Sequence, residues 1–200
     1  MRFSALFFAS MASAHIGAWV PSMLDYNGDG YTSATPMADL PFSQWWFHGN
    51  MDKEDTSAAP FSLPVGSTVT VPLGCRKDVA EGSGENPCPD DTPSMHAGSP
   101  LDPSQLTGCG LAIAYKSEFQ DVKPEDFVVF SVQHDCVRVS KTQFEVPAEM
   151  PACDGGKCIC AWFWQGQSSD NEMVSTDPKS PTFVHFADGV IVHDRFLLQR

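Results

Sequence analysis

Long apolar runs and positive charge are both scarce in this sequence. No run of about 18 apolar residues occurs, so no membrane-spanning helix is expected. Only 12 Lys and Arg stand against 25 Asp and Glu, which gives a net charge of −13. Phosphate backbones and anionic lipids repel such a chain, so nucleic acid and membrane surfaces are not expected partners. A neutral polymer such as a polysaccharide is not repelled.

The sequence also lacks hydrolase motifs and any long stretch in which apolar residues repeat with the period of an α-helix. No G-x-S-x-G motif occurs, and the carboxylates form no recognisable catalytic pair, which disfavours a hydrolase. Short apolar or alternating segments lie between turn-forming residues and predict strands. These strands cover residues 68–71, 109–115, 126–136, 142–147 and 158–165, and the third is expected to be long and largely buried. The pattern predicts an all-β fold, an antiparallel β-sandwich, with a long polar surface loop over residues 76–108.

The first 14 residues have the pattern of a secretory signal peptide. Arg2 is followed by an apolar stretch, and Ala12-Ser13-Ala14 places small residues where signal peptidase requires them. Cleavage after Ala14 makes His15 the first residue of a secreted, extracellular protein. The alternative is that this segment is a buried N-terminal strand.

The cysteines fit an oxidising compartment. Seven are present, and in a secreted chain they predict disulfides whose connectivity the spacing does not give. The group "CDGGKCIC" at residues 153–160 lacks the usual spacing of zinc ligands, so disulfides are favoured over a metal cluster there. The odd count leaves one cysteine free, paired between chains, or without its partner in this sequence.

An N-terminal histidine has two nitrogen donors on one residue, its α-amine and its imidazole Nδ1. With a second histidine they form a three-nitrogen site of the kind that selects Cu(II). His96, in the polar loop before the predicted strand 109–115, is the favoured partner, and His134 is the alternative. His48, after the aromatic run "WWF", is interpreted as structural, whereas His185 and His193 receive no role.

Several segments together resemble one family. They are "HIGAWVPSM", "DLPFSQWWFHG", "FSLPVGSTVTVPL", "GCGLAIAYKSEFQDVKPEDFVVFSV" and "PACDGGKCICAWFWQ", in order over residues 15–174. As a set they resemble the fungal lytic polysaccharide monooxygenases of auxiliary-activity family fourteen. The resemblance implies an immunoglobulin-like or fibronectin-like β-sandwich with long loops and a surface copper site, the histidine brace. It also implies oxidative cleavage of glycosidic bonds with dioxygen or hydrogen peroxide and an external electron donor. Xylan on cellulose is the implied substrate.

By position, His15 and His96 correspond to the two brace histidines. Gln133 or His134 is interpreted as a polar group that orients the oxygen species. The family's axial tyrosine has no counterpart, because no tyrosine follows Tyr115. The nearest substitutes are Met173, Val174, Phe183 and Phe186.

The last segment, residues 175–200, does not resemble the family and is interpreted as a divergent C-terminal segment. Four tryptophans are interpreted first as core and second as sugar-stacking residues: Trp45, Trp46, Trp162 and Trp164. Two other functions stay open. One is a copper-binding protein that keeps the brace but lacks oxidative activity, and the other is a secreted β-sandwich without metal.

Overall fold

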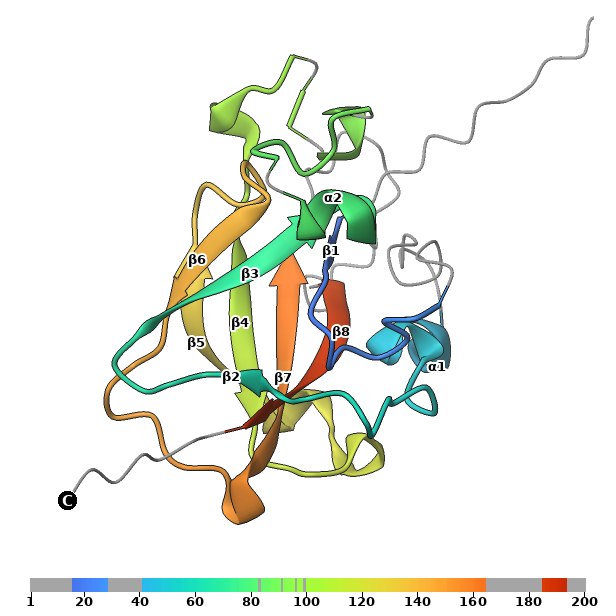
Figure 1. Cartoon of the computed structure of the whole chain (residues 1–200), viewed down its shortest axis with the longest axis vertical. Coiled ribbons are helices and arrows are strands. Elements are labelled where there is room, and N and C mark those ends of the chain that lie inside the picture. The colour runs from blue at the N-terminus through green and yellow to red at the C-terminus, as the bar shows by residue number, and fades with distance from the viewer. Residues whose placement is uncertain are drawn as a thin grey trace, which may run out of the picture.

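Two β-sheets pack face to face in the computed structural model, which describes residues 16–28, 41–82, 84–90, 92–95, 97–98, 100–164 and the backbone of 185–193 (Figure 1). The smaller sheet has three strands in the order β1 (Gly17–Ala18), β3 (Thr68–Gly74) and β6 (Lys141–Glu145). The larger sheet has five strands in the order β2 (Phe61–Ser62), β8 (His185–His193), β7 (Lys157–Trp164), β4 (Cys109–Ala114) and β5 (Val128–Gln133). Every pairing is antiparallel except β2 with β8, so the predicted all-β sandwich is confirmed.

Helices are short in the described part of the chain, and none is long and apolar enough to cross a membrane. The α-helices are α1 (Phe42–Trp45) and α2 (Lys77–Glu81). The 3₁₀ segments are η2 (Trp46–Gly49), η3 (Thr92–Met95), η4 (Pro103–Gln105), η5 (Phe119–Asp121), η6 (Pro124–Asp126) and η7 (Asp154–Gly156). These segments lie in the connections, so the strands carry the architecture.

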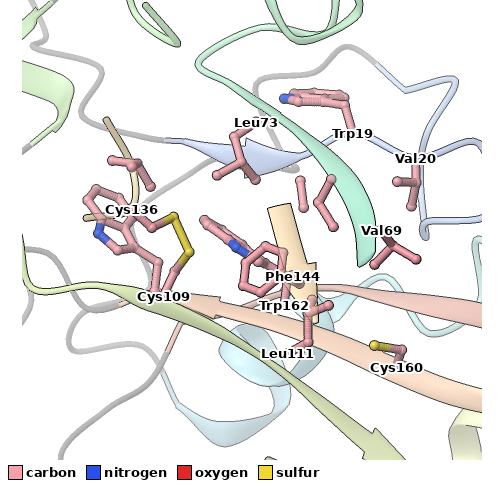
Figure 2. Packing of buried hydrophobic residues seen from close by; sticks show 14 of the residues in the cluster. Trp19, Val20, Val69, Leu73, Cys109, Leu111, Cys136, Phe144, Cys160 and Trp162 are labelled. Carbon is pink, nitrogen blue, oxygen red and sulfur yellow. A yellow bond between two sulfur atoms is a disulfide. The ribbon is translucent and has the colours of Figure 1, made fainter. Parts of the chain in front are cut away.

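The main core lies between the two sheets. In β3, Val69, Val71 and Leu73 are buried while Thr68 and Thr70 are exposed, because side chains alternate across a strand. Figure 2 shows Leu73 and Phe144 from one sheet meeting Leu111 and Trp162 from the other. Burying aromatic and branched side chains contributes about 1.5–3 kcal/mol each, so this layer holds the sheets together.

A second apolar cluster covers the opposite face of the larger sheet. It joins Ala114 and Ile159 of the sheet to Trp46, Phe47 and residues of the connections, namely Leu24, Phe119 and Val122. Strand β7 is therefore buried on both faces. Trp46, Trp162 and Trp164 are all buried, which confirms the core interpretation for them, whereas the side chain of Trp45 lies outside the described residues.

Strand β5 differs from its prediction. Residues 126–136 were expected to be largely buried, but Val128, Val129 and Val132 are 58%, 53% and 53% exposed. The reason is position, since β5 is an edge strand that pairs only with β4. Valine favours extended backbone whether or not a second layer covers it, so composition alone does not reveal burial.

Three disulfides are present: Cys75–Cys88, Cys109–Cys136 and Cys153–Cys158. The second of them lies at one end of the main core (Figure 2). The disulfide interpretation of residues 153–160 is confirmed, because Cys153 and Cys158 are bonded to each other. Cys160 is the free cysteine; its side chain is buried in the core, and burial raises the pKa of its thiol to about 12, so the thiol stays protonated.

Candidate metal centre

One end of the sandwich gathers the segments that carry the candidate ligands. Strand register aligns Gly17 with Gly74, and it aligns Cys109 with both Gln133 and Trp164. The first described residue and the polar loop over residues 76–108 also lie at this end, which is uppermost in Figure 1 next to α2. We refer to it as the loop end. His15 and His96 themselves lie outside the described residues.

The chain that follows His15 is firmly anchored. Ile16 is 4% exposed and belongs to the main core, and Gly17 and Ala18 pair with β3. Trp19 is buried, its backbone N–H donates to the Pro72 carbonyl at 2.8 Å, and its indole Nε1 donates to the Gly74 carbonyl at 2.8 Å. A buried indole that keeps its hydrogen bond is strongly held. Trp19 was not among the sequence candidates, although a tryptophan so close to the predicted cleavage site was a usable signal.

The loop that carries His96 is tied to the core on both sides of that residue. Met95 is 2% exposed and Ala97 is fully buried, while the Ala97 carbonyl accepts a hydrogen bond from Asp102 N at 2.6 Å. Earlier in the loop, the Cys75–Cys88 disulfide joins its start to its middle with a Cα–Cα distance of 5.4 Å. The loop is polar at its surface, but it has internal anchors.

The neighbours of the two histidines share one cluster. Ile16 and Met95 both belong to the main core between the sheets. The described neighbours of His15 and His96 therefore lie in the same buried layer. Within the described ranges, no group of three or more His, Cys, Asp and Glu side chains could hold a metal ion.

The remaining sequence candidates are spread over the fold. Gln133 is half-buried, and its Nε2 donates to the Gln143 carbonyl of β6 at 2.7 Å. His134, directly after it, is exposed. His48 lies in η2 with a positive φ of 53°, against the opposite face of the larger sheet. His185 begins β8 beside Trp164, which puts its backbone at the loop end. Met173, Val174 and Phe183 lie outside the described residues, as does the side chain of Phe186.

A polar contact also fixes α2, the helix that starts the loop. The Tyr26 hydroxyl donates to the carboxylate of Glu81, and Lys77 Nζ lies 3.5 Å from the centre of the Tyr26 ring. Burial, followed by the hydrogen bond to Glu81 and its negative charge, raises the pKa of Tyr26 to about 12. The phenol therefore stays neutral and keeps the segment after β1 against α2.

Comparison with known proteins relates the whole arrangement to one family. A sequence model of the family described as lytic polysaccharide monooxygenase AA14 matches residues 1–175. The AA14 family lytic polysaccharide monooxygenase B of Pycnoporus cinnabarinus is 37% identical over 173 residues, covering 78% of this chain and 46% of its own length. The AA14 monooxygenases B and A of Trametes coccinea are 37% and 39% identical, again over 78% of this chain but only 41% and 40% of their own lengths.

This chain spans less than half the length of each of these relatives. The match nevertheless includes both segments that carry the candidate ligands, the first strand and the polar loop. The chain belongs to the AA14 family of lytic polysaccharide monooxygenases.

Proposed function

We propose that the mature protein begins at His15 and is a secreted, copper-dependent monooxygenase that cleaves glycosidic bonds of plant cell-wall polysaccharide. The observation that carries the proposal is the shared anchoring of Ile16 and Met95 in one core layer at the loop end, within a chain of this family. Removal of residues 1–14 frees the α-amine of His15, which no internal residue has. Without that cleavage the donor set does not exist.

The donor set fits copper. The α-amine and Nδ1 of His15 and an imidazole nitrogen of His96 are the three nitrogens that would hold it, and nitrogen donors of this kind favour Cu(II) over other divalent ions of the first row. The neighbouring residues, Ile16 on one segment and Met95 and Ala97 on the other, are themselves buried. A ligand on an anchored segment loses less conformational entropy when the metal binds.

When bound, copper supplies the redox chemistry by which dioxygen or hydrogen peroxide, with an external electron donor, breaks the bond. The chain's own residues bind the metal and shape its surroundings. Gln133 would be a polar group that orients the oxygen species; its Nε2 donates one hydrogen to the Gln143 carbonyl, which fixes the side chain and leaves its second N–H and its amide oxygen available. His134, exposed on the next turn, is the alternative for this role and for the second ligand.

The proposed substrate is xylan on cellulose, as the family resemblance implies. The net charge of −13 disfavours anionic polymers and leaves neutral ones as partners. The functional domain is proposed to cover residues 15–174, and the end of the family match at residue 175 supports treating residues 175–200 as divergent in sequence. That segment nevertheless supplies the backbone of β8. Met173, Val174, Phe183 or Phe186 is proposed to replace the axial tyrosine.

Release of oxidised oligosaccharides from xylan-coated cellulose tests the proposal. The copper-loaded secreted protein is incubated with ascorbate, and mass spectrometry reads both the products and the mature N-terminus. We expect a chain that starts at His15, oxidised products from the wild type, and none from His96→Ala. His134→Ala tests the alternative ligand and should retain activity if His96 is the second ligand. A mature chain with another first residue would refute the site, and activity unchanged in His96→Ala would refute its second ligand.

One observation favours a second function. No tyrosine occurs between Tyr115 and residue 200, so the family's axial tyrosine has no counterpart in this stretch. Axial groups tune the reactivity of copper sites. A histidine brace that lacks the axial tyrosine fits a copper-binding protein that performs no oxidation. Tight copper binding without oxidised products in the same assay would identify that function.

A further inference from the structure

An open groove lies along one flank of the sandwich, where the edge strand β5 approaches β6. Its volume is about 740 Å³, within the range of roughly 300–1,000 Å³ that is common for ligand sites. Three segments line it, residues 66–68, 130–133 and 145–148. Gln133 is aligned with Cys109 at the loop end, whereas Glu145 is aligned with Thr68 at the opposite end of β3. The groove therefore leads away from the candidate metal centre.

A β-bulge shapes the wall that β5 provides. The register between β4 and β5 shifts at Leu111 and Ala112, which leaves Phe130 as the additional residue. The ring of Phe130 packs against the main core, and Ser131 follows it as the partner of Leu111. Phe130, Ser131 and Gln133 all line this wall of the groove.

Polar groups in the groove are available to a ligand. Among the residues that the structure describes, the side chains of Thr68, Ser131 and Glu145 make no hydrogen bond or ion pair. Val132 and Pro147 add exposed apolar surface to the same walls. Hydroxyl, carboxylate and amide groups next to an aromatic ring and small apolar patches match a sugar, which has hydroxyls around its edge and C–H groups on its faces.

An added peptide strand fits this groove less well. A strand would need a continuous series of free backbone groups on the edge of β6. The Gln143 carbonyl in the middle of β6 already accepts a hydrogen bond from Gln133 Nε2. The edge is therefore capped where an added strand would pair with it.

We propose that this groove, which begins at Gln133 near the loop end and runs along the flank towards Glu145, is a binding site for a neutral oligosaccharide chain. The choice of a glycan rests on the proposed function, but binding here requires no copper. Glu145, Thr68 and Ser131 hydrogen-bond the sugar hydroxyls, while Phe130, Val132 and Pro147 contact the ring faces.

Titration of the copper-free protein tests the groove. Protein stripped with a chelator is titrated with xylohexaose and with cellohexaose, and the dissociation constant is measured by NMR chemical-shift changes. Ala148→Trp fills the groove from its exposed rim, and Ala152→Trp adds the same bulk at an exposed position outside it. We expect at least about tenfold weaker binding for Ala148→Trp and unchanged binding for Ala152→Trp. Glu145→Gln should weaken binding severalfold, whereas its control Glu149→Gln should not.

The outcomes separate the groove from the proposed function. Equal affinities for wild type and Ala148→Trp, or shift changes confined to residues 16–20, would overturn the groove. The absence of binding by either hexasaccharide would overturn it too. Release of oxidised products by the copper-loaded wild type is measured in parallel. If products form but the groove binds nothing, only this inference fails; if the groove binds but no products form, only the proposed function fails.

Discussion

Two tryptophans of the core look equivalent by burial and differ in hydrogen bonding. Trp19 and Trp162 are each 1% exposed, but Trp19 Nε1 donates to Gly74 while Trp162 Nε1 makes no hydrogen bond. Loss of the Trp19 indole leaves the Gly74 carbonyl without its hydrogen bond, at a cost of about 1–3 kcal/mol. Substitution of Trp162 breaks no hydrogen bond and carries no such cost.

Trp19→Phe should therefore lower the free energy of unfolding by about 1–3 kcal/mol more than Trp162→Phe does. Because Trp19 anchors the segment after His15, its substitution should also weaken copper binding, whereas Trp162→Phe should not. Urea denaturation and copper titration measure the two effects. Equal loss of stability in the two variants would contradict the role given to the indole of Trp19.

Tyr26 is a second residue whose surroundings make a measurable difference. Its raised pKa favours the neutral phenol in the folded state, so its contribution to stability is complete below about pH 10 and is lost as the pH rises towards about 12. Glu81→Gln removes the charge and weakens the hydrogen bond, so the pKa of Tyr26 should fall towards 10.

Ultraviolet absorbance near the phenolate band, with Tyr26→Phe to assign the signal, measures this pKa. Glu85→Gln is the control, because Glu85 is exposed and is not among the causes of the shift. An unchanged pKa of Tyr26 in Glu81→Gln would mean that burial alone produces it.

At the scale of elements, the loop over residues 76–108 depends on its disulfide. Cys75 and Cys88 are 13 residues apart, and closing a loop of that size contributes about 2–4 kcal/mol to stability. The double variant Cys75→Ala/Cys88→Ala should lose about that much and should also bind copper more weakly, since the same loop carries His96.

The double variant Cys153→Ala/Cys158→Ala is the matched control. Its disulfide spans only 5 residues and joins Cys153 to the start of β7, at the end of the sandwich opposite the loop end, so stability should fall while copper affinity remains. Thermal unfolding and copper titration of both variants separate the two effects. Equal copper affinity in the two would show that the Cys75–Cys88 bond does not support the site.

The elements also show what sequence can predict. Alternation of Val and Thr predicted the first residues of β3, and continuous apolar residues predicted β4 and β7. The burial of β5 was wrong because its place at the sheet edge depends on the order of strands, which no local pattern contains. The disulfide partners likewise depended on the fold, since spacing does not determine them.

At the scale of the whole molecule, the candidate site depends on how distant segments meet. The sequence predicts the chemistry of an N-terminal histidine, and the family resemblance predicts His96 as its partner; both stay predictions. The anchors Ile16, Trp19 and Met95 were not identified, because their role comes from a core layer built by both sheets. The groove between β5 and β6 also exists only after folding, since it joins residues from three separate segments.

The net charge of −13 belongs to this scale as well. It repels phosphate polymers and is compatible with the neutral polysaccharide proposed as the substrate. The central claim is narrower, because it concerns the three nitrogens contributed by His15 and His96.

Electron paramagnetic resonance of the processed protein with one equivalent of Cu(II) tests that claim most directly. The wild type should give the signal of a single site with three nitrogen ligands, and His96→Ala should lose one of those nitrogens. His134→Ala should give the wild-type signal. A three-nitrogen signal that survives in His96→Ala, or a wild type that binds no copper at this ratio, would contradict the account.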